Sequence, residues 1–283
     1  MKPIARLRPA LPLLPFLAYL TIFLIIPTVT VVAGAFQSNG TFTLGNLKVL
    51  TEGTALAALR ESLLLSAATA LIGAVLGALL AYLLFGLPES SLLRRSVLSL
   101  CGVFAQFGGV VLAFSFIATF GFGGTLTVLI QNLFSHDIAA SPWLYGVRGL
   151  IVVYTYFQIP LMVLVFMPAL QGVRVQWREA AVNLGASTWQ YWTKVAIPLL
   201  TPAFLGAALL LFANAFAAYA TAAVLVSQGN PILPLLIRSA LTSEVLLGRA
   251  DLGFAFALEM IVVVAILMGL YALLLRRTAR WMQ

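Results

Sequence analysis

Six apolar stretches, each long enough to cross a lipid bilayer, constrain this chain more than any other feature. A transmembrane helix needs about 20 mostly apolar residues, and an open strand cannot satisfy its backbone hydrogen bonds in lipid. We therefore predict an all-α membrane protein with six transmembrane helices. The predicted spans are residues 11–36, 62–86, 96–119, 147–170, 198–226 and 254–275.

The composition excludes several other classes of protein. Only 8% of the 283 residues are charged, whereas soluble domains carry about 25%. The net charge of +8 does not indicate nucleic-acid binding, because the basic residues form no dense patch. Cys101 and His136 are the single cysteine and histidine, which excludes an internal disulfide, a Cys/His metal cluster and a histidine-based triad. We predict no catalytic residue, no metal site and no cofactor in this chain.

The first apolar stretch has some features of a signal peptide. Lys2, Arg6 and Arg8 precede it, and Ala33-Gly34-Ala35 resembles a cleavage site. The stretch is longer than a typical signal-peptide core, so we expect it to remain as the first span.

The distribution of charge predicts the orientation in the membrane. With both termini in the cytoplasm, the inside loops and tails hold eleven basic and two acidic residues, and the outside loops hold five of each. Cytoplasmic loops carry the excess of lysine and arginine in membrane proteins. We therefore predict that both termini are cytoplasmic.

The loop between the fourth and fifth predicted spans, about 171–197, is the longest on the cytoplasmic side. It contains good helix formers from Gln176 to Leu184, with Glu179 expected in the first turn, where a carboxylate suits the helix dipole. Gly185 ends or bends this helix, and Ser187 or Thr188 can cap a further turn. The sequence predicts a short cytoplasmic helix with a small-residue face, which suits a groove on a partner protein.

This loop resembles the E-A-A-x-x-x-G loop of the permease subunits of ATP-binding-cassette (ABC) importers. Glu179-Ala180-Ala181 is followed by Gly185 at the family's spacing, and Val195-Ala196-Ile197-Pro198 stands where the family has I-x-L-P. Both aliphatic positions of that second element are conservatively changed. The resemblance implies a permease core at 61–283, with the coupling loop at about 171–197, preceded by a tail, a first span and an outside loop at 1–60.

The resemblance also implies a location in the plasma (inner) membrane of a bacterium, and it implies partners. A second permease subunit, expected to differ from this chain, would complete the pathway, and two ATPase subunits would bind ATP and Mg²⁺. An extracytoplasmic binding protein would deliver a small-molecule substrate, and the chain itself has no G-x-x-x-x-G-K-[ST] nucleotide motif. The residues expected to dock an ATPase subunit are Glu179, Ala180, Ala181 and Gly185, with Arg178 and Ser187 flanking them.

Polar residues inside the spans are costly in lipid and are therefore candidates for the translocation path. Glu259 in the sixth span is the single intramembrane carboxylate. Two roles are alternatives to lining the path: an ion pair with Arg249 or Arg238, or contact of the carboxylate with solvent outside the membrane. The other path candidates are Gln106, Gln158, Asn214 and Tyr219. Each of these four side chains equally suits a hydrogen bond to a neighbouring helix.

The substrate is the least constrained feature. The first span and outside loop resemble the polyamine (spermidine/putrescine) branch of the family, and Glu259 suits a cation. Thiamine, ferric iron, phosphonate and sugars remain alternatives. Two other classes fit less well: an ion-coupled transporter is expected to show internal repeats and midplane carboxylates, and a membrane enzyme requires a catalytic cluster.

Overall fold

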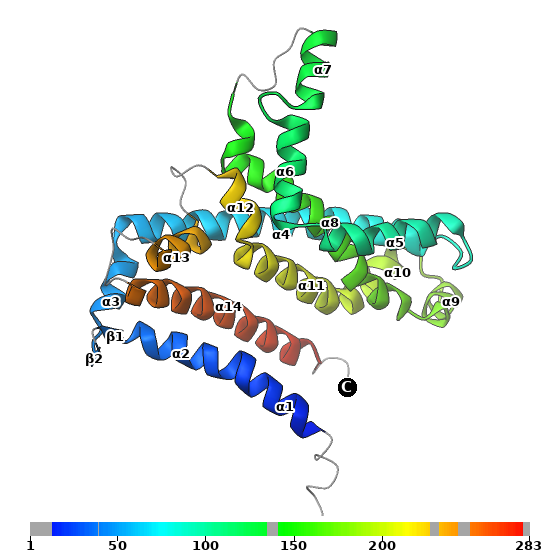
Figure 1. The fold of residues 1–283 in the computed structure, drawn as a ribbon. Coiled ribbons are helices and arrows are strands. Elements are labelled where there is room, and N and C mark those ends of the chain that lie inside the picture. Colours follow the sequence, from blue (N-terminus) through cyan, green and yellow to red (C-terminus); the bar gives the residue numbers. More distant parts are fainter. Residues whose placement is uncertain (1–12, 39, 135–140, 227–231, 243–249, 280–283) are drawn as a thin grey trace, which may run out of the picture. The chain divides into compact units, whose positions relative to one another are not determined.

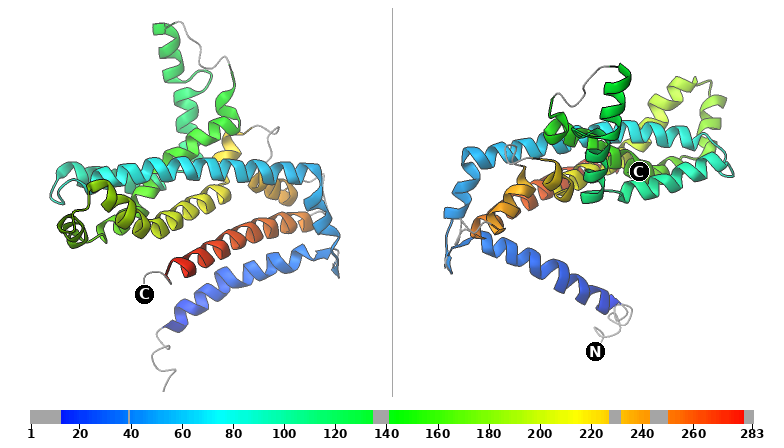
Figure 2. Two further views of the ribbon diagram at one scale, coloured as in Figure 1. Left: turned by 180° about the vertical axis from the view of Figure 1, so that it is seen from behind. Right: turned by 45° about the horizontal axis from the view of Figure 1, so that its top comes forward.

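A computed structural model of the protein describes residues 13–38, 40–134, 141–226, 232–242 and 250–279 (Figures 1 and 2). Six helical segments in these ranges are long and apolar enough to cross a membrane, as predicted. They are Leu14–Ala35, Gly53–Phe85, Gly109–Phe134, Val147–Gln171, Thr188–Ala217 and Asp251–Leu273. Residues 11 and 12 of the first predicted span lie outside the described residues.

The chain divides into two compact units, and the first comprises Met1–Leu56 and Leu236–Val263. Its apolar N-terminal segment is one continuous helical run. The elements of this unit are α1 (Leu14–Leu20), the π-helical η3 (Thr21–Ile25), α2 (Ile26–Ala35), β1 (Gln37–Ser38), β2 (Thr41–Phe42), α3 (Gly45–Lys48), the 3₁₀-helical η4 (Val49–Thr51), most of α13 (Leu233–Thr242) and the first half of α14 (Ala250–Ala279).

The small residues at the end of α2 serve helix packing. A Cβ atom on Gly34 would lie 2.6 Å from the ring of Phe254 on α14, so the two helices approach too closely there for any larger residue. A small apolar core in the same unit contains Ala55, Ala240 and Phe256. The Ala33-Gly34-Ala35 sequence therefore has a structural explanation as a site of close packing.

The second unit comprises Ala57–Leu235 and Val264–Gln283 and has its core around α8. Both α5 and α11 pack against α8 (Figures 1 and 2). The elements outside the connector are α4 (Gly53–Phe85), α5 (Leu92–Gln106), α6 (Gly109–Phe120), α7 (Thr125–Phe134), the 3₁₀-helical η5 (Trp143–Tyr145), α8 (Val147–Gln171), α11 (Ile197–Ala217) and α12 (Ala220–Leu225).

Two glycines on α4 allow close approach to α8. A Cβ atom on Gly73 would lie 2.6 Å from the Cβ of Gln158, and one on Gly77 would lie 2.7 Å from the carbonyl oxygen of Ile159 and would overlap the Cβ of Met162. The Gly73/Gly77 pair, four residues apart, indicates tight helix packing from sequence alone. The structure confirms that interpretation.

The predictions of single helices over 96–119 and 198–226 are wrong. The first region is divided between α5 and α6, because Gly108 and Gly109 interrupt the helix and Gly109 has a φ of +68°. The third membrane-length helical segment accordingly runs from Gly109 to Phe134. The second region breaks between α11 and α12 at Ala218, whose backbone is extended.

The outside loops contain more helix than the sequence predicted. Helix α4 begins at Gly53, nine residues before the predicted span, because residues 53–61 are good helix formers although they include Arg60 and Glu61. Helices α7 and α13 lie in segments that we expected to be loops.

Candidate functional site

The connector between α8 and α11 contains the predicted short helix, α9 (Val175–Asn183). Its C-terminal end has two hydrogen bonds typical of a Schellman motif. The Ala186 N–H donates to the Ala181 oxygen and the Gly185 N–H donates to the Val182 oxygen, each at 2.9 Å. Gly185 has a φ of +79°, a left-handed conformation that favours glycine.

A second helical turn, α10 (Thr188–Tyr191), follows directly. Ser187 is its N-cap: the Ser187 hydroxyl accepts from the Gln190 N–H at 3.2 Å, and the Gln190 side-chain oxygen accepts from the Ser187 N–H at 2.8 Å. This capping box satisfies two backbone donors at once. The structure thus selects Ser187 from the two predicted capping residues.

The motif residues on α9 face away from the helical core. No residue of α9 is buried: Glu179 and Ala180 are exposed, and Ala181 is half-buried. A Cβ atom on Gly185 would meet no other atom within 4 Å among the described residues. The small surface that these residues present is therefore open to a partner.

The interpretation of Glu179 as a first-turn residue is wrong. Helix α9 begins at Val175, so Glu179 is its fifth residue, and the first turn contains no acidic side chain. The helix dipole acts mainly on the first turn, so it does not explain the carboxylate at this position.

Aromatic side chains attach the connector to the ends of the long helices. The π-helical segment η6 (Trp192–Ala196) joins α10 to α11 without interruption. Trp192 packs edge-on against Tyr82 of α4, with ring centroids 5.2 Å apart. Tyr191 is buried. Helix therefore runs without interruption from α10 into α11, and a short turn at residues 184–187 joins it to α9.

Three of the predicted path residues line one pocket. Gln106, Asn214 and Tyr219 lie around a cavity of about 310 Å³, together with the aromatic ring of Phe157 and the hydroxyl of Thr221. Thr221 was missed by the sequence analysis, because a lone threonine in an apolar run carries no distinct signal. None of the ten residues that line this pocket is charged.

The pocket lies where two helices are interrupted. Gln106 ends α5 and Gly109 begins α6, while Tyr219 lies between α11 and α12. The Thr221 hydroxyl donates to the Gly109 oxygen at 3.1 Å, which ties the two breaks together. Main-chain ends therefore contribute to the pocket in addition to side chains, as in discontinuous membrane helices that line a cavity.

Gln158 occupies a different environment. Its side chain is fully buried, and its Nε2 donates to the Leu211 oxygen on α11 at 3.0 Å. It is not among the residues that line the pocket between the helix breaks. This is the helix-to-helix hydrogen bond that the sequence left open as the alternative to a path role.

Glu259 lies in the part of α14 that belongs to the first unit. Its side chain is half-buried, and its Oε2 atom is buried without a hydrogen-bond partner among the described residues. Arg249, one of its two proposed ion-pair partners, lies outside those residues. An unpartnered carboxylate oxygen in an apolar helix retains the capacity to bind a cation or a donor.

These features define a polytopic membrane protein with an exposed connector helix and a pocket of uncharged polar groups between helix breaks. The family model described as "Binding-protein-dependent transport system inner membrane component" matches residues 109–280. The chain belongs to this family, and it is an ABC permease, as its resemblance to the E-A-A loop predicted.

Curated relatives carry several different substrate names. The chain is 29% identical over 138 residues to the thiamine transport system permease protein ThiP of Escherichia coli (strain K12), covering 49% of this chain and 25% of that protein. It is 28% identical over 185 residues to the sulfate transport system permease protein CysT of the same organism, covering 65% and 62%. A ferric transport system permease protein, FbpB of Actinobacillus pleuropneumoniae, is 22% identical over 214 residues, covering 75% and 31%. The chain thus spans a third or less of the thiamine and ferric relatives.

Solved structures share the fold. A bacterial ABC transporter involved in the import of the acidic polysaccharide alginate matches with a TM-score of 0.77 at 17% identity, covering 94% of this chain and 93% of that chain. The MetNI methionine ABC transporter in an inward-facing conformation matches with a TM-score of 0.59 at 16% identity, covering 79% and 95%. At these identities the likeness establishes the ABC permease fold alone.

Proposed function

We propose that this chain is a permease subunit of an ABC importer and forms half of a translocation pathway. The observation that carries the proposal is the exposed helix α9, which is joined to α8 at one end and, at the other, through a tight turn to the continuous helix that runs from α10 into α11. In this proposal α9 is the coupling helix, on the cytoplasmic side with both termini, and Glu179, Ala180, Ala181 and Gly185 contact an ATPase subunit.

The proposed assembly has the partners that the family description names or implies. Two ATPase subunits bind ATP and Mg²⁺, and a second permease subunit completes the pathway. An extracytoplasmic binding protein delivers the substrate, for which support comes from an alginate transporter solved in complex with a substrate-bound periplasmic protein. Residues 61–283 form the permease core, and residues 1–60 add a first span and an outside loop.

Reconstitution in vesicles tests this function. We expect uptake to require the second permease subunit, the ATPase subunits, the binding protein and ATP. Uptake by this chain alone, driven by an ion gradient, would favour a secondary transporter. Chemical turnover of a substrate by the isolated chain would favour a membrane enzyme.

Within this function we propose that the pocket between the helix breaks is part of the path. Asn214→Leu removes an amide that can donate and accept, so we expect ATP-driven uptake to fall about three- to tenfold, the effect of one or two lost hydrogen bonds. Asn132→Leu is the matched control, because Asn132 is exposed on α7 and does not line the pocket. Equal uptake by the two variants would contradict the path role of Asn214.

For the substrate, we propose a solute recognised mainly by hydrogen bonds and aromatic contact, which matches the uncharged pocket. Thiamine leads, supported by the names of relatives and by Phe157 and Tyr219 in the pocket wall. Ferric and sulfate importers are the alternatives that relatives support. A polyamine has less support, because its ammonium groups would require carboxylates and none lines this pocket.

Glu259→Gln separates these substrates. If the cargo is a polyamine that contacts Glu259, we expect the variant to lower uptake about tenfold, since a charge-assisted bond is lost. For an anionic cargo such as sulfate we expect little change, and for thiamine, whose thiazolium ring carries a single positive charge, we expect a smaller loss than for a polyamine. Measuring the uptake of radiolabelled thiamine, sulfate, ferric ion and spermidine by wild type and variant identifies the class. Unchanged uptake of a transported polyamine would remove Glu259 from the path.

A further inference from the structure

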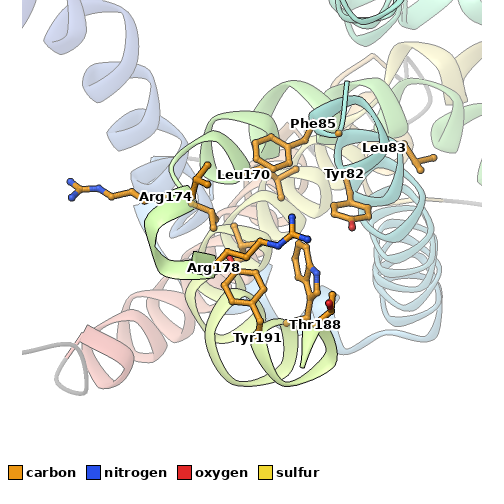
Figure 3. A pocket seen from close by; sticks show the side chains of 13 residues that line it. Tyr82, Leu83, Phe85, Leu170, Arg174, Arg178, Thr188 and Tyr191 are labelled. Atoms are coloured by element: carbon orange, nitrogen blue, oxygen red, sulfur yellow. The ribbon is translucent and has the colours of Figure 1, made fainter. Parts of the chain in front are cut away.

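A second pocket lies beneath the connector. It has a volume of about 370 Å³ and is lined by the end of α4, the end of α8, the connector and the start of α11 (Figure 3). The three membrane-length segments that border it end or begin there, at Phe85, Gln171 and Thr188. The pocket therefore lies at the level where the apolar helices meet the aqueous phase.

The lining combines an aromatic wall with cationic groups. Tyr82, Phe85, Tyr191 and Trp192 supply the aromatic surface, and the lining includes two arginines but no acidic residue. Tyrosine and tryptophan side chains at the ends of membrane-spanning helices favour the interfacial region of a bilayer. An apolar pocket with an unopposed positive charge suits a ligand with an anionic head and an apolar body.

Arg178 is the group that gives the pocket its charge. Figure 3 shows its side chain reaching across the pocket toward Tyr82, whereas Arg174 extends away. Arg174 lies instead near the ring of Trp177, with its guanidinium carbon 6.0 Å from the ring centroid. Arg178 has no ion-pair partner within the described ranges. A guanidinium of this kind is well suited to bind a phosphate oxygen.

The pocket is lined by one face of α9. Val175 and Arg178, three residues apart, both line the pocket, and residues at this spacing share a helix face. Ala180 does not line it, and at about 100° per residue it projects to the opposite side of the helix. A ligand in the pocket would leave Ala180 free for a protein partner.

We propose that this pocket binds the phosphate headgroup of an anionic phospholipid of the surrounding leaflet. The phosphate pairs with Arg178, and the glycerol and upper acyl groups contact Tyr82, Phe85 and Trp192. The bound lipid then touches both α9 and the end of α4, so it stabilises the connector in its position against the long helices. This site is independent of the cargo and of the identity of the ATPase.

The test is lipid binding by the full chain, purified in neutral detergent and titrated with phosphatidylglycerol or phosphatidylethanolamine of the same acyl chains, followed by native mass spectrometry. We expect preferential retention of one phosphatidylglycerol. Arg178→Gln should weaken that binding about tenfold. Arg95→Gln is the matched control, because Arg95 is an exposed arginine of α5 that does not line the pocket, and it should bind as wild type does.

A second pair of variants tests the cavity itself. Gly86 lines the pocket, and a Cβ atom there would make only ordinary contacts, with its nearest neighbour 3.5 Å away. Gly86→Leu should fill the space and reduce phosphatidylglycerol binding without changing any charge. Gly102→Leu on α5 is its control, since nothing within 4 Å in the described part of the chain meets a Cβ atom at that position.

Several results would overturn the proposal. Equal binding of the two lipids would exclude recognition of the anionic headgroup, and equal effects of Arg178→Gln and Arg95→Gln would exclude Arg178. Wild-type lipid binding by Gly86→Leu would place the lipid elsewhere. Displacement of the lipid by inorganic phosphate at the same concentration would identify a soluble anion as the ligand. The assay contains no ATPase, so its outcome is separate from that of the coupling proposal.

Discussion

Gly185→Val is expected to reduce ATP-driven uptake at least tenfold and to weaken co-purification of the ATPase subunits, while the chain still inserts in the membrane. Gly185 has a φ of +79° within the Schellman end of α9. A non-glycine residue in this conformation costs about 1–2 kcal/mol, and a β-branched residue costs more. The end of α9 must then change its path, which displaces the surface proposed to contact the ATPase.

Two further variants separate backbone strain from lost contact. Gly40→Val is the control for strain, because Gly40 has the same φ of 79° with no atom within 4 Å of a Cβ position in the described structure, but lies in the β1–β2 turn. It should leave ATPase association unchanged. Gly185→Asn keeps the left-handed conformation accessible, so any loss of association in that variant reports contact with the partner. Wild-type association and uptake in Gly185→Val would contradict the docking role.

Gly77→Leu is expected to prevent normal packing of α4 on α8 and to destabilise the protein by about 3 kcal/mol, the upper part of the range for overpacked cores. A Cβ atom on Gly77 would overlap the Cβ of Met162 and approach the carbonyl oxygen of Ile159 to 2.7 Å. A backbone carbonyl cannot rotate away as a flexible side chain can, so the helices must separate.

The measurement is thermal unfolding of the detergent-solubilised protein. The fraction that remains monodisperse on size-exclusion chromatography after heating gives the unfolding temperature. Gly102→Leu adds the same side chain to α5, where a Cβ atom meets no neighbour within 4 Å among the described residues, and it should unfold close to wild type. Similar unfolding temperatures for the two leucine variants would show that the α4–α8 approach tolerates a side chain.

The sequence predicted the connector well because its signals are local. Glycine in a left-handed conformation and a hydroxyl residue at a helix start depend on backbone geometry within a few residues, and Gly185 and Ser187 have these roles. The number of spans was equally accessible, since hydropathy is additive along the chain. Whether Ala180 and Ala181 contact an ATPase depends on a second protein and stays a prediction.

The helix breaks were not predicted, because hydropathy averages over them. Gly108-Gly109 lies within an apolar stretch, and Ala218 and its neighbours contain no helix breaker. Packing acts at the second break: the Tyr154 hydroxyl donates to the Ala218 oxygen at 2.7 Å, 64 residues away in sequence. The role of Gln158 was likewise not predictable from nearby sequence. Its side chain packs between helices because it donates to the carbonyl oxygen of Leu211, which is distant in sequence.

The interrupted helices also bear on how such a chain can acquire new cargo. Part of the polar surface of the pocket is main chain exposed where α5 and α11 stop, and main chain persists when side chains are substituted. In the proposed path, substitution of Gln106, Asn214 or Thr221 would change the specificity, while the hydrogen-bonding groups of the main chain would remain. Relatives named for thiamine, sulfate and ferric transport are compatible with a change of substrate on one fold.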